Sequence, residues 1–193
     1  MDSERLTLAC ATTAEARAAR RAGGRAALIG LAGANGLPAG PLVSFGLAGA
    51  LDGLPTGTVI DAERVVDEHG SVLWEGEPLG VAGAVRGTIL ASDRVVDERE
   101  ERLRLHEATG ADATDLESGP LARSGRLRGV LRVVSDTPDR TLHGICAAVT
   151  PQGSYDWPGL VKAFARSPRG FAAAARDAKR ALDELARAAE ALS

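Results

Sequence analysis

Two short apolar runs that end in acidic residues constrain the fold of this chain most strongly. Residues 113–118 read Ala-Thr-Asp-Leu-Glu-Ser, and a helix-like segment over 119–125 follows them. Residues 130–134 are mostly apolar and β-branched with one charge, so they predict a buried strand. That strand stops at residues 135–136, Ser-Asp, and Pro138 just beyond them breaks any continuation.

These runs place Glu117 and Asp136 at comparable positions, each where a strand ends. In an open α/β sheet, ligands bind at the ends of strands, so a neighbouring pair of acids indicates acid–base chemistry on a small polar substrate. A purely structural role also fits. Asp115 or Ser118 would cap a helix, and Asp136 would form a turn. Spacing alone leaves both interpretations open.

The rest of the chain alternates between strand and helix patterns, with a β-rich middle. This order predicts an α/β fold with a mixed rather than purely parallel sheet. At 193 residues, without a repeat or a low-complexity linker, we expect a single domain over 1–193. The expected strands are 6–10, 26–30, 41–45, 58–60, 64–66, 71–74 and 87–91, with a hairpin turn at 68–70. The expected helices are 14–21, 98–107 and 168–192, and the helix over 98–107 is expected to be charged and exposed.

Composition excludes several classes of function. The net charge is −3, aromatic residues make up 3% of the chain, and no basic stripe appears, so we expect no nucleic-acid partner. No apolar stretch approaches the roughly 18 residues of a membrane span, and the first residues do not form a signal peptide. We therefore expect a cytoplasmic protein with no stable membrane insertion.

The cysteines and histidines indicate neither a metal nor a cofactor. Cys10 and Cys146 lie far apart without a CxxC pattern, and we expect buried, reduced thiols. The three histidines are scattered and lack metal-ligand spacing: His69, His106 and His143. We expect no metal and no cofactor.

Three further features bear on a site. Glycines follow the strand at 41–45, over 46–53, and permit a ligand to approach the backbone closely, although neither GxGxxG nor a P-loop is present. Glu15 lies in the first turn of a helix, where the helix dipole alone explains an acid. The C-terminal helix carries one apolar stripe, so we expect it to pack and assign it no chemistry.

Four motifs in this order resemble the purine nucleoside phosphorylase and nucleosidase superfamily. They are Ser-Phe-Gly-Leu-Ala-Gly-Ala-Leu-Asp at 44–52, Ser-Asp at 92–93, Thr-Asp-Leu-Glu-Ser at 114–118 and Arg-Val-Val-Ser-Asp at 132–136. The amino-acid sequence of these motifs is most similar to that of the hopanoid-associated branch, which acts on adenosylhopane. The next most similar are the methylthioadenosine/S-adenosylhomocysteine nucleosidases. The resemblance implies a three-layer fold with a mixed central sheet flanked by helices, and a homodimer.

The resemblance also implies roles for particular residues. Glu117 would hold the ribose 2′- and 3′-hydroxyls, and Asp136 would protonate the purine at N7. Glu15 falls where nucleosidases keep the acid that activates the attacking water. The remaining substrate-binding residues would be Ala48, Gly49, Val95, Leu116 and Ser135.

Water is the expected nucleophile. Phosphorylases of the superfamily use a Gly-rich N-terminal turn and an Arg before the central glycine motif. Here the turn contains Glu15, which would repel a phosphate dianion, and no Arg precedes Gly46. The resemblance thus implies an N-ribosyl hydrolase of an adenine nucleoside with a bulky 5′ group. The alternatives are a phosphorylase, a futalosine hydrolase or a non-catalytic nucleoside-binding protein.

Two departures from the family pattern bear on the substrate. The aromatic residue that usually stacks on the base is replaced by Val95, and the middle segment over 74–86 is short. We expect a pocket with an open, apolar 5′ end.

Overall fold

The computed structural model describes residues 6–140 and 148–192. Cys146 and His143 lie outside these residues, whereas Cys10 is buried as a free thiol, as expected. The strands are β1 (Thr7–Cys10), β2 (Ala26–Leu28), β3 (Leu42–Ala50), β4 (Val59–Val66), β5 (Val72–Glu75), β6 (Val85–Ala91), β7 (Ala113–Asp115) and β8 (Leu127–Asp136). The helices are α1 (Thr13–Arg21), the 3₁₀ turn η1 (Leu31–Gly33), α2 (Arg99–Thr109), α3 (Ser118–Arg123), α4 (Trp157–Arg166) and α5 (Pro168–Glu190).

These strands form one mixed sheet that closes on itself. β3 pairs with β8, β8 with β4, β4 with β6, β6 with β7, and β7 returns to β3. β1 and β2 extend the sheet beyond β3, and β5 extends it beyond β4. β3–β8 and β1–β3 are parallel, while β4–β8 and β3–β7 are antiparallel. The expectation of a mixed sheet is confirmed.

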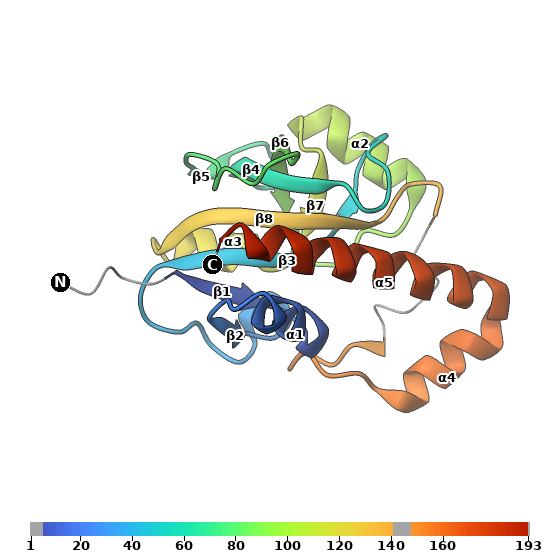
Figure 1. Cartoon of the computed structure of the whole chain (residues 1–193). Helices are drawn as coiled ribbons and strands as arrows, with labels where there is room; N and C mark the ends of the chain where they lie inside the picture. Colours follow the sequence, from blue (N-terminus) through green and yellow to red (C-terminus); the bar gives the residue numbers. More distant parts are fainter. Residues whose placement is uncertain (1–5, 141–147, 193) are drawn as a thin grey trace.

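Helices cover both faces of this sheet (Figure 1). α1 and α5 pack together over β1 and β8, and they bury Phe45, Leu131 and Leu185 in one apolar cluster. α3 lies on the opposite face against a second cluster that includes Leu121 and Val130. Alternate residues of one strand serve opposite faces, which is why Val130 and Leu131 fall in different clusters. The three-layer α/β fold is as predicted.

The observed elements correct four expectations. β3 does not end at Phe45 but continues through the glycines to Ala50, and the two predicted strands at 58–60 and 64–66 are the single strand β4. The helix predicted as charged and exposed buries Arg102. Helix α4 was not predicted at all.

Local sequence explains where the helices begin and end. Thr12 and Glu15 form a reciprocal capping box at the start of α1. Gly110 ends α2 in the left-handed conformation, with φ of 69°. Pro168 begins α5, because its missing N–H costs nothing at a first helical position. Within residues 6–140 and 148–192, no helix is long and apolar enough to span a membrane.

Candidate active site

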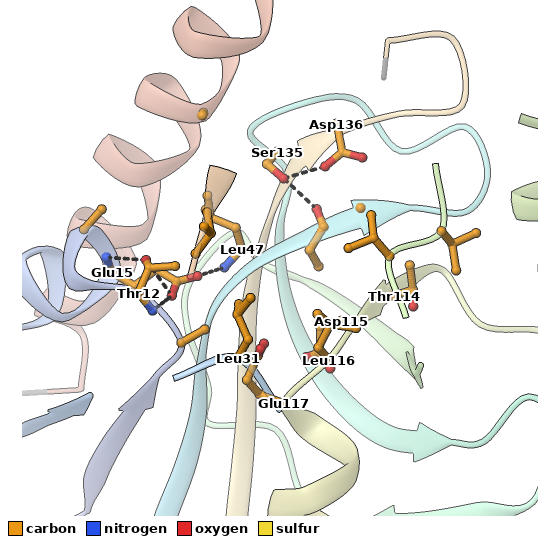
Figure 2. Close-up of a pocket in the computed structure, with 18 of the residues that line it drawn as sticks. Thr12, Glu15, Leu31, Leu47, Thr114, Asp115, Leu116, Glu117, Ser135 and Asp136 are labelled. Atoms are coloured by element: carbon orange, nitrogen blue, oxygen red, sulfur yellow. Dashed lines mark hydrogen bonds between the residues drawn. The ribbon is translucent and has the colours of Figure 1, made fainter. Parts of the chain in front are cut away.

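A pocket opens where β3, β7 and β8 end, and α1, α2 and α5 border its other sides (Figure 2). The closed pairing of the sheet brings these strand ends together from distant parts of the sequence. All eight candidate residues named from the sequence line this pocket: Glu15, Ala48, Gly49, Val95, Leu116, Glu117, Ser135 and Asp136. No group of His, Cys, Asp or Glu side chains suited to hold a metal ion occurs in the described part of the chain.

Glu15 has both a structural role and a place in the pocket. Its Oε2 accepts hydrogen bonds from the Thr12 backbone N–H at 2.7 Å and the Thr12 hydroxyl at 2.9 Å. Its Oε1 accepts one from the Leu47 backbone N–H at 2.8 Å, across the gap to β3. The carboxylate therefore caps α1 and is held against the pocket wall at the same time. The structural and the functional interpretation are compatible.

Arg132 on β8 is a fully buried cation at the centre of the acids. Its Nε lies 2.6 Å from Asp115 Oδ2, and its Nη1 lies 3.5 Å from Glu117 Oε2. Nη2 donates to the Ser44 hydroxyl at 2.6 Å. A buried guanidinium is stable only when carboxylates and acceptors replace its water. Arg132 makes ion pairs with Asp115 and Glu117, and its Nη1 and Nη2 donate hydrogen bonds, while its Nε makes an ion pair without a hydrogen bond. Arg132 thus joins β7 to β8 and orients the carboxylate of Glu117.

Glu117 is 4% exposed. Its Oε1 accepts a hydrogen bond of 3.3 Å from the Ala32 backbone N–H. Burial raises the pKa of Glu117 to about 8, the charges of Asp115 and Glu15 add to this rise, and Arg132 opposes it. Desolvation is the largest cause, because removing the carboxyl from water disfavours its charged form.

Asp136 ends β8 and is 3% exposed. Its Oδ1 lies 2.6 Å from the Ser135 hydroxyl, and its Oδ2 accepts a hydrogen bond from the Arg102 guanidinium. Burial raises the pKa of Asp136, while Arg102 and Ser135 oppose the rise. The carboxyl is therefore desolvated at the end of an apolar strand.

The glycines of β3 are required by close approach rather than by backbone conformation. A Cβ at Gly46 would lie 2.5 Å from Glu15 Oε1 and 2.6 Å from Arg132 Nη1. A Cβ at Gly49 would lie 2.9 Å from Asp136 Oδ2. Glycine in a strand weakens the strand, so its use here marks where charged side chains cross the sheet surface. The sequence had indicated close approach of a ligand, and the structure shows close approach of the acids.

Sequence reasoning missed several residues that shape the pocket. Arg102 was hidden in a helix of many charges, and nothing in the sequence distinguishes it. Arg132 carried a signal, because it is the one charge in an apolar strand. The C-terminal helix was assigned packing alone, yet its Ala178 and Leu182 line the pocket. Val95 is 46% exposed at the pocket rim, where it leaves an aliphatic surface.

No protein-family model and no curated protein matches this chain. Solved structures match over nearly all of it. Native futalosine hydrolase of Helicobacter pylori aligns with a TM-score of 0.67 at 14% identity, over 98% of this chain and 97% of that chain. The 5′-methylthioadenosine/S-adenosylhomocysteine nucleosidase of the same organism, with butyl-thio-DADMe-Immucillin-A, gives 0.65 at 13% identity, over 100% and 98%.

A third example is the 5′-methylthioadenosine/S-adenosylhomocysteine nucleosidase of Neisseria meningitidis in complex with methylthio-immucillin-A. It aligns with a TM-score of 0.61 at 15% identity, over 97% of this chain and 99% of that chain. These likenesses show the class of fold: a mixed central sheet flanked by helices, arranged as in the nucleosidases. This chain has that fold along essentially its whole length.

Proposed function

We propose that this protein is an N-ribosyl hydrolase of the purine nucleoside phosphorylase and nucleosidase superfamily, and that it cleaves adenine from a nucleoside with a bulky 5′ group. The observation that carries the proposal is that Glu117, between β7 and α3, and Asp136, at the end of β8, are buried in one pocket and held in different environments. Arg132 contacts the first and Arg102 the second. Two acids with distinct surroundings suit two distinct roles.

The proposed reaction uses each acid once. As the C1′–N9 bond breaks, its electron pair goes to the purine, and Asp136 gives a proton to N7. The sugar acquires oxocarbenium character, which Glu117 favours when it is ionised and accepts hydrogen bonds from the ribose hydroxyls, much as in glycoside hydrolysis. Water adds at C1′ and loses its proton through Glu15. The products are adenine and the free sugar.

Water is favoured over phosphate by the pairing of the pocket cations. Arg102 is bound to Asp136, and Arg94 is bound to Glu101 at 2.6 Å, so both already serve carboxylates. Glu15 borders the pocket and adds negative charge. A phosphate dianion needs donors and positive charge that these groups do not offer.

The 5′ group is proposed to be bulky and apolar, as in adenosylhopane. Support comes from the aliphatic and aromatic residues that line the pocket beyond the acids: Leu31, Val95, Val149, Tyr155, Ala178 and Leu182. The enzyme is proposed to act as a cytoplasmic homodimer, as the resemblance implies.

Futalosine hydrolysis is the second candidate, because a solved futalosine hydrolase shares the fold over the whole chain. In the superfamily that this chain resembles, enzymes of 6-oxopurines often carry Asn at the position of Asp136, and enzymes of 6-aminopurines carry Asp. Asp136 therefore favours an adenine nucleoside over futalosine.

The test is release of the free base. Purified protein is incubated with adenosine, methylthioadenosine, a 5′-alkylated adenosine and futalosine, and the bases are separated by chromatography. We expect adenine, with the 5′-alkylated adenosine cleaved faster than adenosine. Release of the base from futalosine alone would support the second candidate. Binding without release of any base would make the protein a nucleoside-binding module.

A further inference from the structure

Helix α4 presents an exposed apolar face. Trp157 is 75% exposed, Val161 65% and Phe164 51%. Their spacing of four and three residues places them on one side of the helix. We call these three residues the α4 face. Exposed large apolar side chains that gather on one face mark an interaction surface more often than scattered ones do.

The α4 face lies close in sequence to residues that line the pocket. The chain reaches α4 from Val149 and Tyr155, which line the pocket, and it leaves α4 into α5, whose Leu182 also lines it. Figure 1 shows α4 outside the layers of the sheet, joined to the far end of α5. The Phe164 and Phe171 rings meet edge to face at 5.7 Å, which ties α4 to α5.

The same segment is basic. Residues 157–176 contain no Asp or Glu, although the chain as a whole has a net charge of −3. The four cations in this stretch are all exposed: Lys162, Arg166, Arg169 and Arg176. A helix with Trp and Phe on one face and cations on the opposite, polar face is the kind that lies in the surface of an anionic membrane.

We propose that the α4 face docks this protein on the surface of an anionic lipid bilayer. The apolar side chains enter the boundary between headgroups and acyl chains, and the cations contact the lipid phosphates.

Docking would bring the pocket mouth to the membrane. A nucleoside whose 5′ group is a lipid could then enter while its apolar tail stays in the bilayer. This consequence rests on the proposed nucleosidase function, whereas the docking itself does not.

The experiment is co-sedimentation with vesicles, using the full chain. Vesicles of phosphatidylcholine alone are compared with vesicles that contain phosphatidylglycerol, at low and high salt. We expect binding to the anionic vesicles and weakening by salt. The triple variant W157S/V161S/F164S should bind at least about tenfold more weakly, since burial of apolar area drives interfacial binding. The matched control V72S, at a site 52% exposed on β5, should bind as wild type.

The charge contribution is tested by K162E/R166E. Each cation near an anionic surface strengthens binding about fivefold, so this double reversal should abolish the preference for phosphatidylglycerol. The proposal is overturned if wild type ignores anionic vesicles at low salt, or if the triple variant binds them as wild type does. It is also overturned if the triple variant changes the oligomeric state in analytical ultracentrifugation, because the face would then bind another copy.

A soluble substrate separates the two proposals. Adenine release from methylthioadenosine should be unchanged in the triple variant, which also shows that it is folded. If no variant and no wild-type sample releases a base, the proposed function fails, and the vesicle result still decides docking.

Discussion

Arg102 on α2 forms a buried ion pair with Asp136 at the end of β8. Their side chains are 1% and 4% exposed. Two further hydrogen bonds fix the guanidinium of Arg102: its Nε donates to the Val96 carbonyl at 3.0 Å, and its Nη1 donates to the Ala50 carbonyl at 3.1 Å. The proposed general acid is therefore positioned by a residue from an element that bears no other part of the site.

Replacing Arg102 with Met should move the pH profile of kcat/KM. The groups that face Asp136 are Arg102 from α2, Asp97 from the segment before α2, and Ser135 from its own strand. Removing the cation favours the protonated carboxyl, so the pKa of Asp136 rises and the basic limb of the profile moves to higher pH. Stability should fall by about 3–5 kcal/mol, because a buried charge loses its partner. Arg102→Lys keeps the positive charge and should return the basic limb of the profile to its wild-type pH. If the basic limb of Arg102→Met coincides with that of the wild type, the role of Arg102 is structural only.

Asp136→Asn should slow adenine release by about 10²–10⁴, the usual contribution of a general acid. An amide cannot give N7 the proton that the leaving base needs. The matched control is Asp139→Asn, three residues further on, where the side chain is 80% exposed. Both variants are compared by single-turnover kinetics. Near wild-type release by Asp136→Asn would leave this residue as a turn former.

Glu117→Gln should abolish turnover and flatten the pH dependence of stability. The pKa of Glu117 is about 8 in the folded protein, above its ordinary value of 4.5, so the folded state binds this proton more tightly than the unfolded state. Stability of the wild type should therefore fall as pH rises from about 4.5 to about 8. The variant lacks this titrating group and should show a shallower slope in urea unfolding curves, with the remainder due to Asp136, whose pKa is also raised. An unchanged slope would show that Glu117 is not the titrating group.

Phosphate should not accelerate the reaction. The cations that line the pocket, Arg94 and Arg102, already bind carboxylates, and Glu15 would repel a dianion. Adenine release is expected to be flat between phosphate-free buffer and millimolar phosphate. The products are checked for a ribose 1-phosphate, and its appearance would make the enzyme a phosphorylase.

Gly49→Ala should reduce kcat about tenfold or more with a modest effect on stability. The new methyl would lie 2.9 Å from Asp136 Oδ2 and 3.2 Å from Arg102 Nη1, so the ion pair must shift. A misplacement of this size at a catalytic group costs up to about a hundredfold. Gly53→Ala is the control, because a Cβ there meets nothing within 4 Å. Equal rates for the two variants would show that Asp136 tolerates displacement.

The sequence by itself determined most of the elements and placed two acids where strands end. Apolar periodicity predicted β8 and α5, since the spacing of apolar residues is a local property of the chain. Strand ends indicated Glu117 and Asp136, because side chains beyond a buried strand must leave the core. The local pattern failed at Gly46, where it predicted the end of a strand that β3 continues past.

Only the tertiary structure decided which charges meet. Arg102 belongs to a helix whose other charges are solvated, and it reaches Asp136 because α2 packs beside the end of β8. Arg132 faces Asp115 and Glu117 because β7 and β8 both pair with β3. Such pairings join residues far apart in sequence, and the desolvation that shifts their pKa values depends on the whole surrounding core. No local pattern encodes that burial.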